Sequence, residues 1–277
     1  MRAWRHAVGL AAVVVALFPL VFAVSASLNP SGTLTGANAL FSDVSLEHYA
    51  RLFGDPLHPF PRWFANTLVI GLSTATGSVL LGACAAYAFS RFRFRGHRAG
   101  LVGLVFVQLF PQLLAYVAIF LLLSALKEVF PPLGLGSTLG LVMVYLGGAL
   151  GVNTWLMKGF LDAIPRELDE SAQLDGASHA RIFFRVLLPL SAPILVVVGL
   201  FSFVATTNDF VIAGLVLTDP EQQTLAVGLY QLVSYQFGQN WGVFTAGALL
   251  GAVPVLVLFQ FLQRFIVSGL TSGSVKT

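Results

Sequence analysis

The sequence predicts an all-α fold: a polytopic membrane protein with six transmembrane helices, forming a single domain over residues 1–277. Three observations predict it. Hydrophobic residues make up 57% of the chain, charged residues only 10%, and the mean hydropathy is +0.85, whereas about 25% of a soluble domain is charged. Six apolar segments have the length that a helix needs to cross a bilayer, about 20 residues. The basic residues alternate between the two sides of these segments.

The six predicted spans follow the apolar stretches of the chain. They cover residues 7–28, 66–90, 100–126, 137–161, 190–217 and 244–267. Glycines and Asn153 interrupt the fourth, but glycine is common in packed membrane helices. Pro111 and Pro254 each remove a backbone hydrogen bond, so we expect a bend at both.

The charges predict the orientation. All but three of the 15 Lys and Arg residues fall on one side, which the positive-inside rule makes cytoplasmic; the exceptions are Arg51, Arg62 and Lys127. Both termini are then cytoplasmic and the expected location is a bacterial inner membrane. An N-terminal signal peptide is the alternative for residues 7–28, because basic residues precede the apolar run and Ser25-Ala26-Ser27 follows it. The run is long for a signal peptide, so we expect the helix to be retained.

The loops narrow the class of protein further. Residues 29–65 and about 218–243 are expected outside, the first with a short helix near 46–53. The only cysteine, Cys84, excludes an internal disulfide and a thiolate metal cluster. The histidines lie outside the spans without metal-ligand spacing, and there is no phosphate-binding loop. We therefore expect no catalytic residue, metal or cofactor on this chain, and no nucleic-acid partner.

Residues 165–189 form the most informative segment. Pro165 suits a first helical turn, and the acidic residues after it suit the positive end of a helix. Gly176 would end that helix, and Ser178 would cap a second one that runs through Val186 before Pro189. A short exposed helix–turn–helix buries little against its own chain, so we expect it to dock on a partner.

This segment resembles the EAA loop of ABC-importer permeases: Glu170-Ser171-Ala172, then Gly176, then Val186-Leu-Leu-Pro189 at the family spacing. It departs from the pattern at Ser171 and Val186. The resemblance implies a type I ABC importer permease with a cytoplasmic coupling helix that fits the ATPase subunit. The implied coupling residues are Glu170, Ser171, Ala172, Asp175, Gly176, Arg181 and Pro189. Arg181 serves equally well as an inside-positive charge that holds the topology.

Other stretches resemble carbohydrate permeases of the maltose/maltodextrin type. They are Arg91–Gly96, Gln108–Gln112, Asn208–Phe210, Leu225–Leu229 and the tail, residues 268–277. The resemblance implies an external loop that reaches into the sugar-binding protein and a tail that enters the ATPase dimer. The implied tail contacts are Gly269, Leu270, Thr271, Gly273, Val275 and Lys276. A free, flexible terminus would have a similar composition.

Polar residues inside spans are candidates for a translocation path or gate, because burying them in lipid is costly. They are Asp209, Asn208, Gln108 and Gln112. Hydrogen bonds between helices are the alternative for each of them. The resemblance also places most sugar contacts on a second, larger permease.

The expected function is that of a permease subunit in a binding-protein-dependent ABC importer. The expected substrate is maltose, maltodextrin or a related glucoside such as trehalose. The implied partners are a second permease, two ATP-binding subunits that hold ATP and Mg, an extracytoplasmic sugar-binding protein and the lipid bilayer. A secondary transporter would need an ion site at mid-membrane, and a membrane enzyme would need a catalytic constellation. Neither pattern is present.

Overall fold

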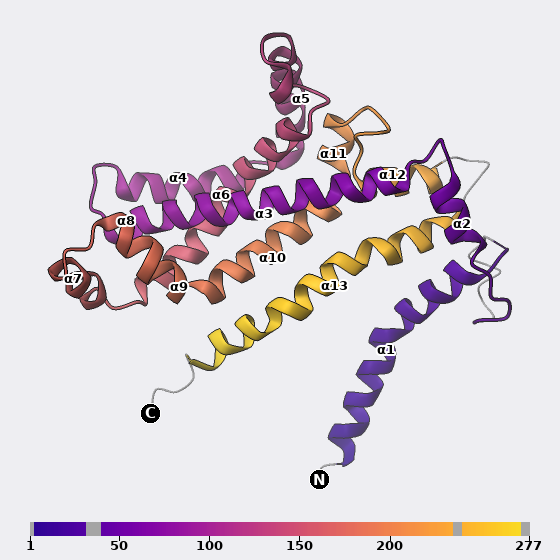
Figure 1. Cartoon of the computed structure of the whole chain (residues 1–277), viewed down its shortest axis with the longest axis horizontal. Helices are drawn as coiled ribbons and strands as arrows, with labels where there is room; N and C mark the ends of the chain where they lie inside the picture. The colour runs from indigo at the N-terminus through magenta and orange to yellow at the C-terminus, as the bar shows by residue number, and fades with distance from the viewer. Residues whose placement is uncertain (1–2, 32–39, 235–239, 273–277) are drawn as a thin grey trace. The chain divides into compact units, whose positions relative to one another are not determined.

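The computed structural model describes residues 3–31, 40–234 and 240–272, and every regular element in these ranges is helical (Figure 1). The chain divides into two compact units. Unit 1 comprises Met1–Asn66 and Asp219–Pro254, and unit 2 comprises Thr67–Thr218 and Val255–Thr277. The prediction of one permease domain stays a prediction.

Unit 1 is built on a small apolar core. Its elements are α1 (Ala3–Leu28), α2 (Glu47–Gly54), α12 (Leu225–Ser234), the start of α3 (Phe60–Arg91) and the start of α13 (Trp241–Ser272). Trp63 is fully buried, and its indole Nε1 donates a 2.7 Å hydrogen bond to the Pro220 carbonyl. Gly228 of α12 lies directly on this ring, since a Cβ there would come within 2.2 Å of it. The helix at residues 47–54 confirms the short helix predicted near 46–53.

Helix α1 is held to unit 1 only at its C-terminal end. Its apolar stretch from Trp4 is exposed within the described part of the chain, whereas Ser25, Ser27 and Asn29 are buried. Ser27 shares a 3.0 Å hydrogen bond with the Tyr49 hydroxyl, and the Asn29 carbonyl lies 2.7 Å from Nε2 of His48. Within unit 1, the apolar part of α1 is left uncovered.

Unit 2 packs several helices side by side. They are the rest of α3, α4 (His97–Leu109), α5 (Gln112–Val129), η2 (Pro131–Leu133), α6 (Thr138–Asp162), α10 (Ala192–Asn208), α11 (Val211–Val216) and the end of α13. Helix α6 packs against both α4 and α10. At the Arg91 end of α3 lie α7 (Glu167–Leu174), α8 (His179–Ile182), η3 (Phe183–Leu187) and α9 (Leu188–Leu190) (Figure 1).

In the described residues, four unbroken helices are long and apolar enough to cross a membrane. If each of two bent pairs of helices counts as one span, the total is six. The four are Trp4–Leu28, Phe60–Arg91, Thr138–Asp162 and Trp241–Phe265. They correspond to the predicted first, second, fourth and sixth spans. The bent pairs are α4 with α5, and His179–Leu190 with α10.

Two predicted spans are not the continuous helices that the apolar stretches suggested. The third, residues 100–126, bends at Pro111 as predicted, and the bend is large enough to break it, because the axes of α4 and α5 differ by 100°. Proline supplies no N–H to continue α4 and pushes the preceding Phe110 into an extended conformation. The fifth, residues 190–217, breaks at Asp209, whose carboxylate accepts a 3.0 Å hydrogen bond from the backbone N–H of Ala213 in α11. A side chain that binds free N–H groups favours the start of a new helix.

Candidate functional site

The predicted coupling segment is a helix, a tight turn and a second helix. Helix α7 carries Glu167, Asp169 and Glu170 in its first turn, where the helix dipole favours negative charge. Gly176 then takes a φ of +78°. A Cβ at Gly176 would meet no atom within 4 Å, so the backbone conformation is what requires glycine here. The turn predicted from the sequence is confirmed.

The second helix begins as predicted and then departs from regular α geometry. The Ser178 side chain accepts a hydrogen bond from the Arg181 N–H at 3.4 Å, which makes Ser178 the N-cap of α8. The chain widens into a π-helical turn, η3, before α9, which contains Pro189. Proline cannot donate to the carbonyl four residues earlier, that of Arg185, and its ring crowds that carbonyl. The wider π-helical turn gives the ring of Pro189 room beside that carbonyl.

Most of the predicted coupling residues face outward. Glu170, Ser171, Asp175, Gly176, Arg181 and Pro189 are all exposed. Ala172 is half-buried and packs against the core of unit 2. Leu174, at the end of α7, is 90% exposed. Sequence reasoning did not single out Leu174.

Arg91 fixes this segment to the spans. Its Nε lies 2.6 Å from Oδ2 of Asp169 in α7, and the two side chains are only 7% and 12% exposed. Its Nη1 and Nη2 donate 3.0 Å hydrogen bonds to the carbonyls of Leu161 and Ile164, at the C-terminal end of α6. The guanidinium therefore joins the end of α3, the end of α6 and the first turn of α7.

A second layer of polar contacts supports the same junction. Arg166 donates a 2.8 Å hydrogen bond to the Ser90 carbonyl, and the Ser90 hydroxyl donates one of 2.7 Å to Asp162. Lys158 pairs with Asp162 at 2.5 Å. Sequence reasoning missed the roles of Ser90, Arg91 and Asp169. The only signal was the run of basic residues after the second span, and it does not reveal a partner so far away in the chain.

The predicted contacts of the tail fall partly outside the described residues. Helix α13 continues to Ser272, so Gly269, Leu270 and Thr271 lie on its last turns rather than in an irregular tail from residue 268. Gly273, Val275 and Lys276 are outside the described residues. The segment Leu225–Leu229 begins α12, with Leu225 and Leu229 in the core of unit 1. Those two side chains are committed to that core and do not reach outward into a partner.

The four polar residues predicted in spans are not gathered together. The Tyr145 hydroxyl donates a 3.0 Å hydrogen bond to Oδ1 of Asp209. Gln108 instead donates to the Gly148 carbonyl of α6 at 2.7 Å, which fits the alternative of a bond between helices. Asn208 is exposed and donates to the Val204 carbonyl of its own helix. The side chain of Gln112 is outside the described structure.

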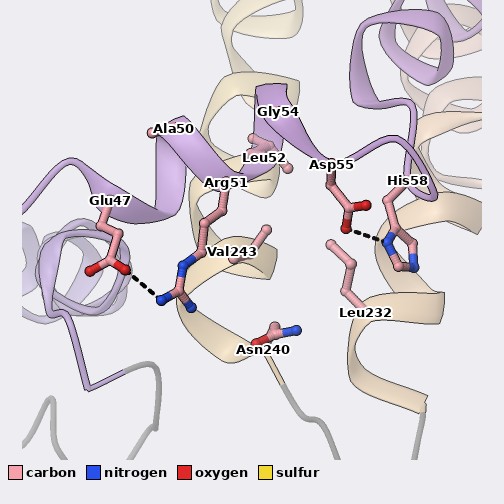
Figure 2. Close-up of a pocket in the computed structure, with 10 residues that line it drawn as sticks. All are labelled: Glu47, Ala50, Arg51, Leu52, Gly54, Asp55, His58, Leu232, Asn240 and Val243. Carbon is pink, nitrogen blue, oxygen red and sulfur yellow. Dashed lines mark hydrogen bonds and ion pairs between the residues drawn. The ribbon is translucent and has the colours of Figure 1, made fainter.

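A pocket of about 460 Å³ opens in unit 1 between α2 and the beginning of α13. Glu47 and Arg51 form an ion pair on one wall, and Asp55 lies 2.6 Å from Nδ1 of His58 on another (Figure 2). Burial raises the pKa of Asp55, but hydrogen bonds from His58 and from the backbone of Leu57 outweigh it, and the pKa is lowered. The pocket is therefore polar and charged.

These features define a class of protein. An all-helical chain with up to six spans, and with an exposed helix–turn–helix fixed to the ends of two of them, is a multi-span membrane transport subunit. The chain belongs to the family of inner membrane components of binding-protein-dependent transport systems, whose family model matches residues 78–272.

Relatives with curated names cover nearly the whole chain. The galactooligosaccharide transport system permease protein GanQ of Bacillus subtilis is 41% identical over 95% of this chain and 91% of its own length. The maltodextrin permease protein MdxG of the same organism is 37% identical over 95% and 92%. The maltose/maltodextrin permease protein MalG of Yersinia pestis is 38% identical over 98% and 92%.

Solved structures confirm the fold. A chain of a bacterial ABC transporter involved in importing the acidic polysaccharide alginate superposes with a TM-score of 0.78, at 24% identity and with 94% of each chain covered. A chain of the MetNI methionine ABC transporter, in an inward-facing conformation, gives 0.55 at 18% identity, over 76% of this chain and 93% of its own. The chain thus has the fold of a type I ABC importer permease.

Proposed function

We propose that this chain is the permease subunit of an ATP-driven oligosaccharide importer and that it couples transport to ATP hydrolysed on two separate subunits. The observation that carries the proposal is the exposed α7–Gly176–α8 turn, fixed to α3 and α6 through Arg91. Relatives at about 40% identity with sugar-permease names support it. The chain itself would bind no ATP, Mg or other cofactor and would have no catalytic site.

The mechanism follows from the junction at Arg91. Closure of the ATP-binding subunits would push on α7. Because α7 is tied to the ends of α3 and α6 by a buried ion pair and by helix-end hydrogen bonds, the push would move both helices together. A sugar-loaded binding protein would favour the outward-facing state by binding it more tightly.

Maltodextrins and related glucosides such as trehalose are the proposed substrates. Galactooligosaccharides are the second candidate, because the relative GanQ, at 41% identity, carries that name. To decide between them, each sugar is supplied with its own binding protein to the reconstituted complex, and the stimulation of ATP hydrolysis is measured. Stimulation by neither class would contradict the proposal.

The orientation and the remaining contacts belong to the same proposal. With both termini in the cytoplasm, α7 and the tail residues Gly269, Leu270, Thr271, Gly273, Val275 and Lys276 would face the ATPase. The charged pocket of unit 1 would face outside, where the binding protein docks (Figure 2). Of the polar residues predicted in spans, Asp209 is the one we retain for the translocation path, since Gln108 and Asn208 bond to backbone carbonyls.

Co-purification tests the coupling segment. Gly176→Arg places a long charged side chain at a residue with a positive φ on the exposed turn, and we expect it to abolish binding of the ATP-binding subunit. The matched control is Gly136→Arg in the loop before α6, where φ is also positive, at +88°, and a Cβ also meets no atom within 4 Å. Normal assembly and sugar-stimulated ATPase activity in Gly176→Arg would remove α7 and its turn from the coupling role.

A further inference from the structure

A cavity of about 380 Å³ lies within unit 2 between α6 and α10, at the lower end of the 300–1,000 Å³ range of small-molecule sites. Six polar side chains line it: Thr74, Tyr145, Asn153, Ser202, Thr206 and Asp209. Thr74 is 1% exposed, and its hydroxyl has no hydrogen-bond partner in the described residues. Most of these groups bond to one another or to backbone within unit 2, but the Thr74 hydroxyl does not, and unpaired polar groups inside a membrane bundle favour a polar occupant.

The polar groups form two pairs at opposite ends of the cavity. Tyr145 donates to Asp209, and Asn153 donates a 3.1 Å hydrogen bond to the Ser202 hydroxyl. Tyr145 and Asn153 are eight residues apart on α6, which corresponds to roughly 12 Å along the helix. A ligand that touches both pairs needs hydroxyl groups spread over more than one pyranose ring. The exposed ring of Phe201, next to Ser202 in the chain, adds an apolar surface to the lining.

The cavity offers hydrogen-bond donors as well as acceptors: among the described residues, the Thr74 and Ser202 hydroxyls and the second N–H of the Asn153 amide donate to no partner. Oδ1 of Asp209 takes the bonds from Tyr145 and Ala213, while Oδ2 takes none from the described residues. Oδ1 of Asn153 is likewise free of a donor there. The described residues place no Lys, Arg or His within ion-pair distance of Asp209, so its charge is not neutralised. The cavity therefore suits a ligand that both donates and accepts hydrogen bonds and carries no negative charge.

We propose that this cavity is a saccharide-binding site on this chain that takes two neighbouring rings of a neutral oligosaccharide. Asp209 and Asn153 accept hydrogen bonds from sugar hydroxyls at its two ends, and the Asp209 carboxylate disfavours acidic sugars. The inference rests on the proposed function and goes beyond the expectation that most sugar contacts lie on the second permease.

The test uses the complete reconstituted importer with its binding protein, trapped by vanadate, and radiolabelled maltotriose as the probe. The quantity measured is maltotriose retained per ADP trapped, which partial misassembly does not alter. We expect Asp209→Asn and Asn153→Ala each to lower this ratio by roughly tenfold, the effect of losing a buried hydrogen bond to a ligand. The matched control is Asn208→Ala, because Asn208 adjoins Asp209 but bonds to its own helix.

The outcomes separate the two proposals. A wild-type complex that traps no ADP, or retains no sugar, contradicts the proposed function itself. Wild-type ratios in both variants, or an equal loss in Asn208→Ala, would overturn the saccharide site while leaving the importer intact. A second probe, the anionic maltobionate, should be retained less than its neutral parent maltose by the wild-type complex. That difference should narrow in Asp209→Asn, and an unchanged difference would overturn the role of the carboxylate.

Discussion

The guanidinium group of Arg91, at the end of α3, contacts both α7 and the C-terminal end of α6. It pairs with Asp169, whose other oxygen, Oδ1, is buried without a hydrogen bond, so Asp169 depends on Arg91 for compensation. The Nε atom is close to Asp169 without the alignment of a hydrogen bond, which makes this contact mainly a pairing of charges. Removing one partner of such a buried pair leaves an uncompensated charge.

We expect Arg91→Gln to destabilise the junction by about 3–5 kcal/mol. The apparent Tm of the purified complex and its sugar-stimulated ATPase activity should both fall. Arg93→Gln is the matched control, because Arg93 is exposed in the same basic run. The double variant Arg91→Gln/Asp169→Asn should cost less than the sum of the single variants. Additive effects would show that the two side chains do not interact.

The pair of Asp55 and His58 predicts a pH dependence. Because hydrogen bonding lowers the pKa of Asp55 in the folded protein, its stabilising contribution is present above the ordinary pKa of aspartate. It is lost as the pH falls through the lowered value. Asp55→Asn should therefore lower the apparent Tm at neutral pH, and the gap to wild type should close in strong acid. A gap that persists unchanged in acid would contradict this account.

At the scale of helices, α12 shows how a segment that resembles a contact loop can be structural. We expect Gly228→Ala to destabilise unit 1 by about 1–3 kcal/mol, because the new methyl group would overlap the buried Trp63 ring. Gly54→Ala in the same unit has open space around it and should be nearly neutral. Thermal unfolding of the two variants side by side checks this. Equal Tm values would mean that the ring can move aside.

The success of sequence reasoning depended on how local each feature was. The turn at Gly176 and the cap at Ser178 follow from neighbouring residues, and both were predicted. The bend at Pro111 follows from the missing N–H of proline and was predicted, whereas the break at Asp209 was not, because hydropathy does not register which backbone N–H groups find partners. The pairing of Arg91 with Asp169 depends on how α3, α6 and α7 pack together, and no pattern in the sequence carries that information.

At the scale of the whole molecule, the predicted orientation is open to direct measurement. In a Cys84→Ala background, Leu57→Cys lies in the loop that is predicted to be external, where Leu57 is 80% exposed. Ser171→Cys lies on the exposed surface of α7. An impermeant maleimide should label Leu57→Cys in intact cells and Ser171→Cys only in inside-out vesicles. The reverse pattern would invert the topology.

Helix α1 has a consequence for how the sequence can change over evolution. Within unit 1 its apolar stretch is exposed, so the packing of that unit constrains those residues only to remain hydrophobic and helical. Its C-terminal end is different, since Ser25, Ser27 and Asn29 are buried and bonded to the loop and to α2. Among relatives, residue identities over 4–21 should drift at nearly constant hydropathy, while these three positions change slowly.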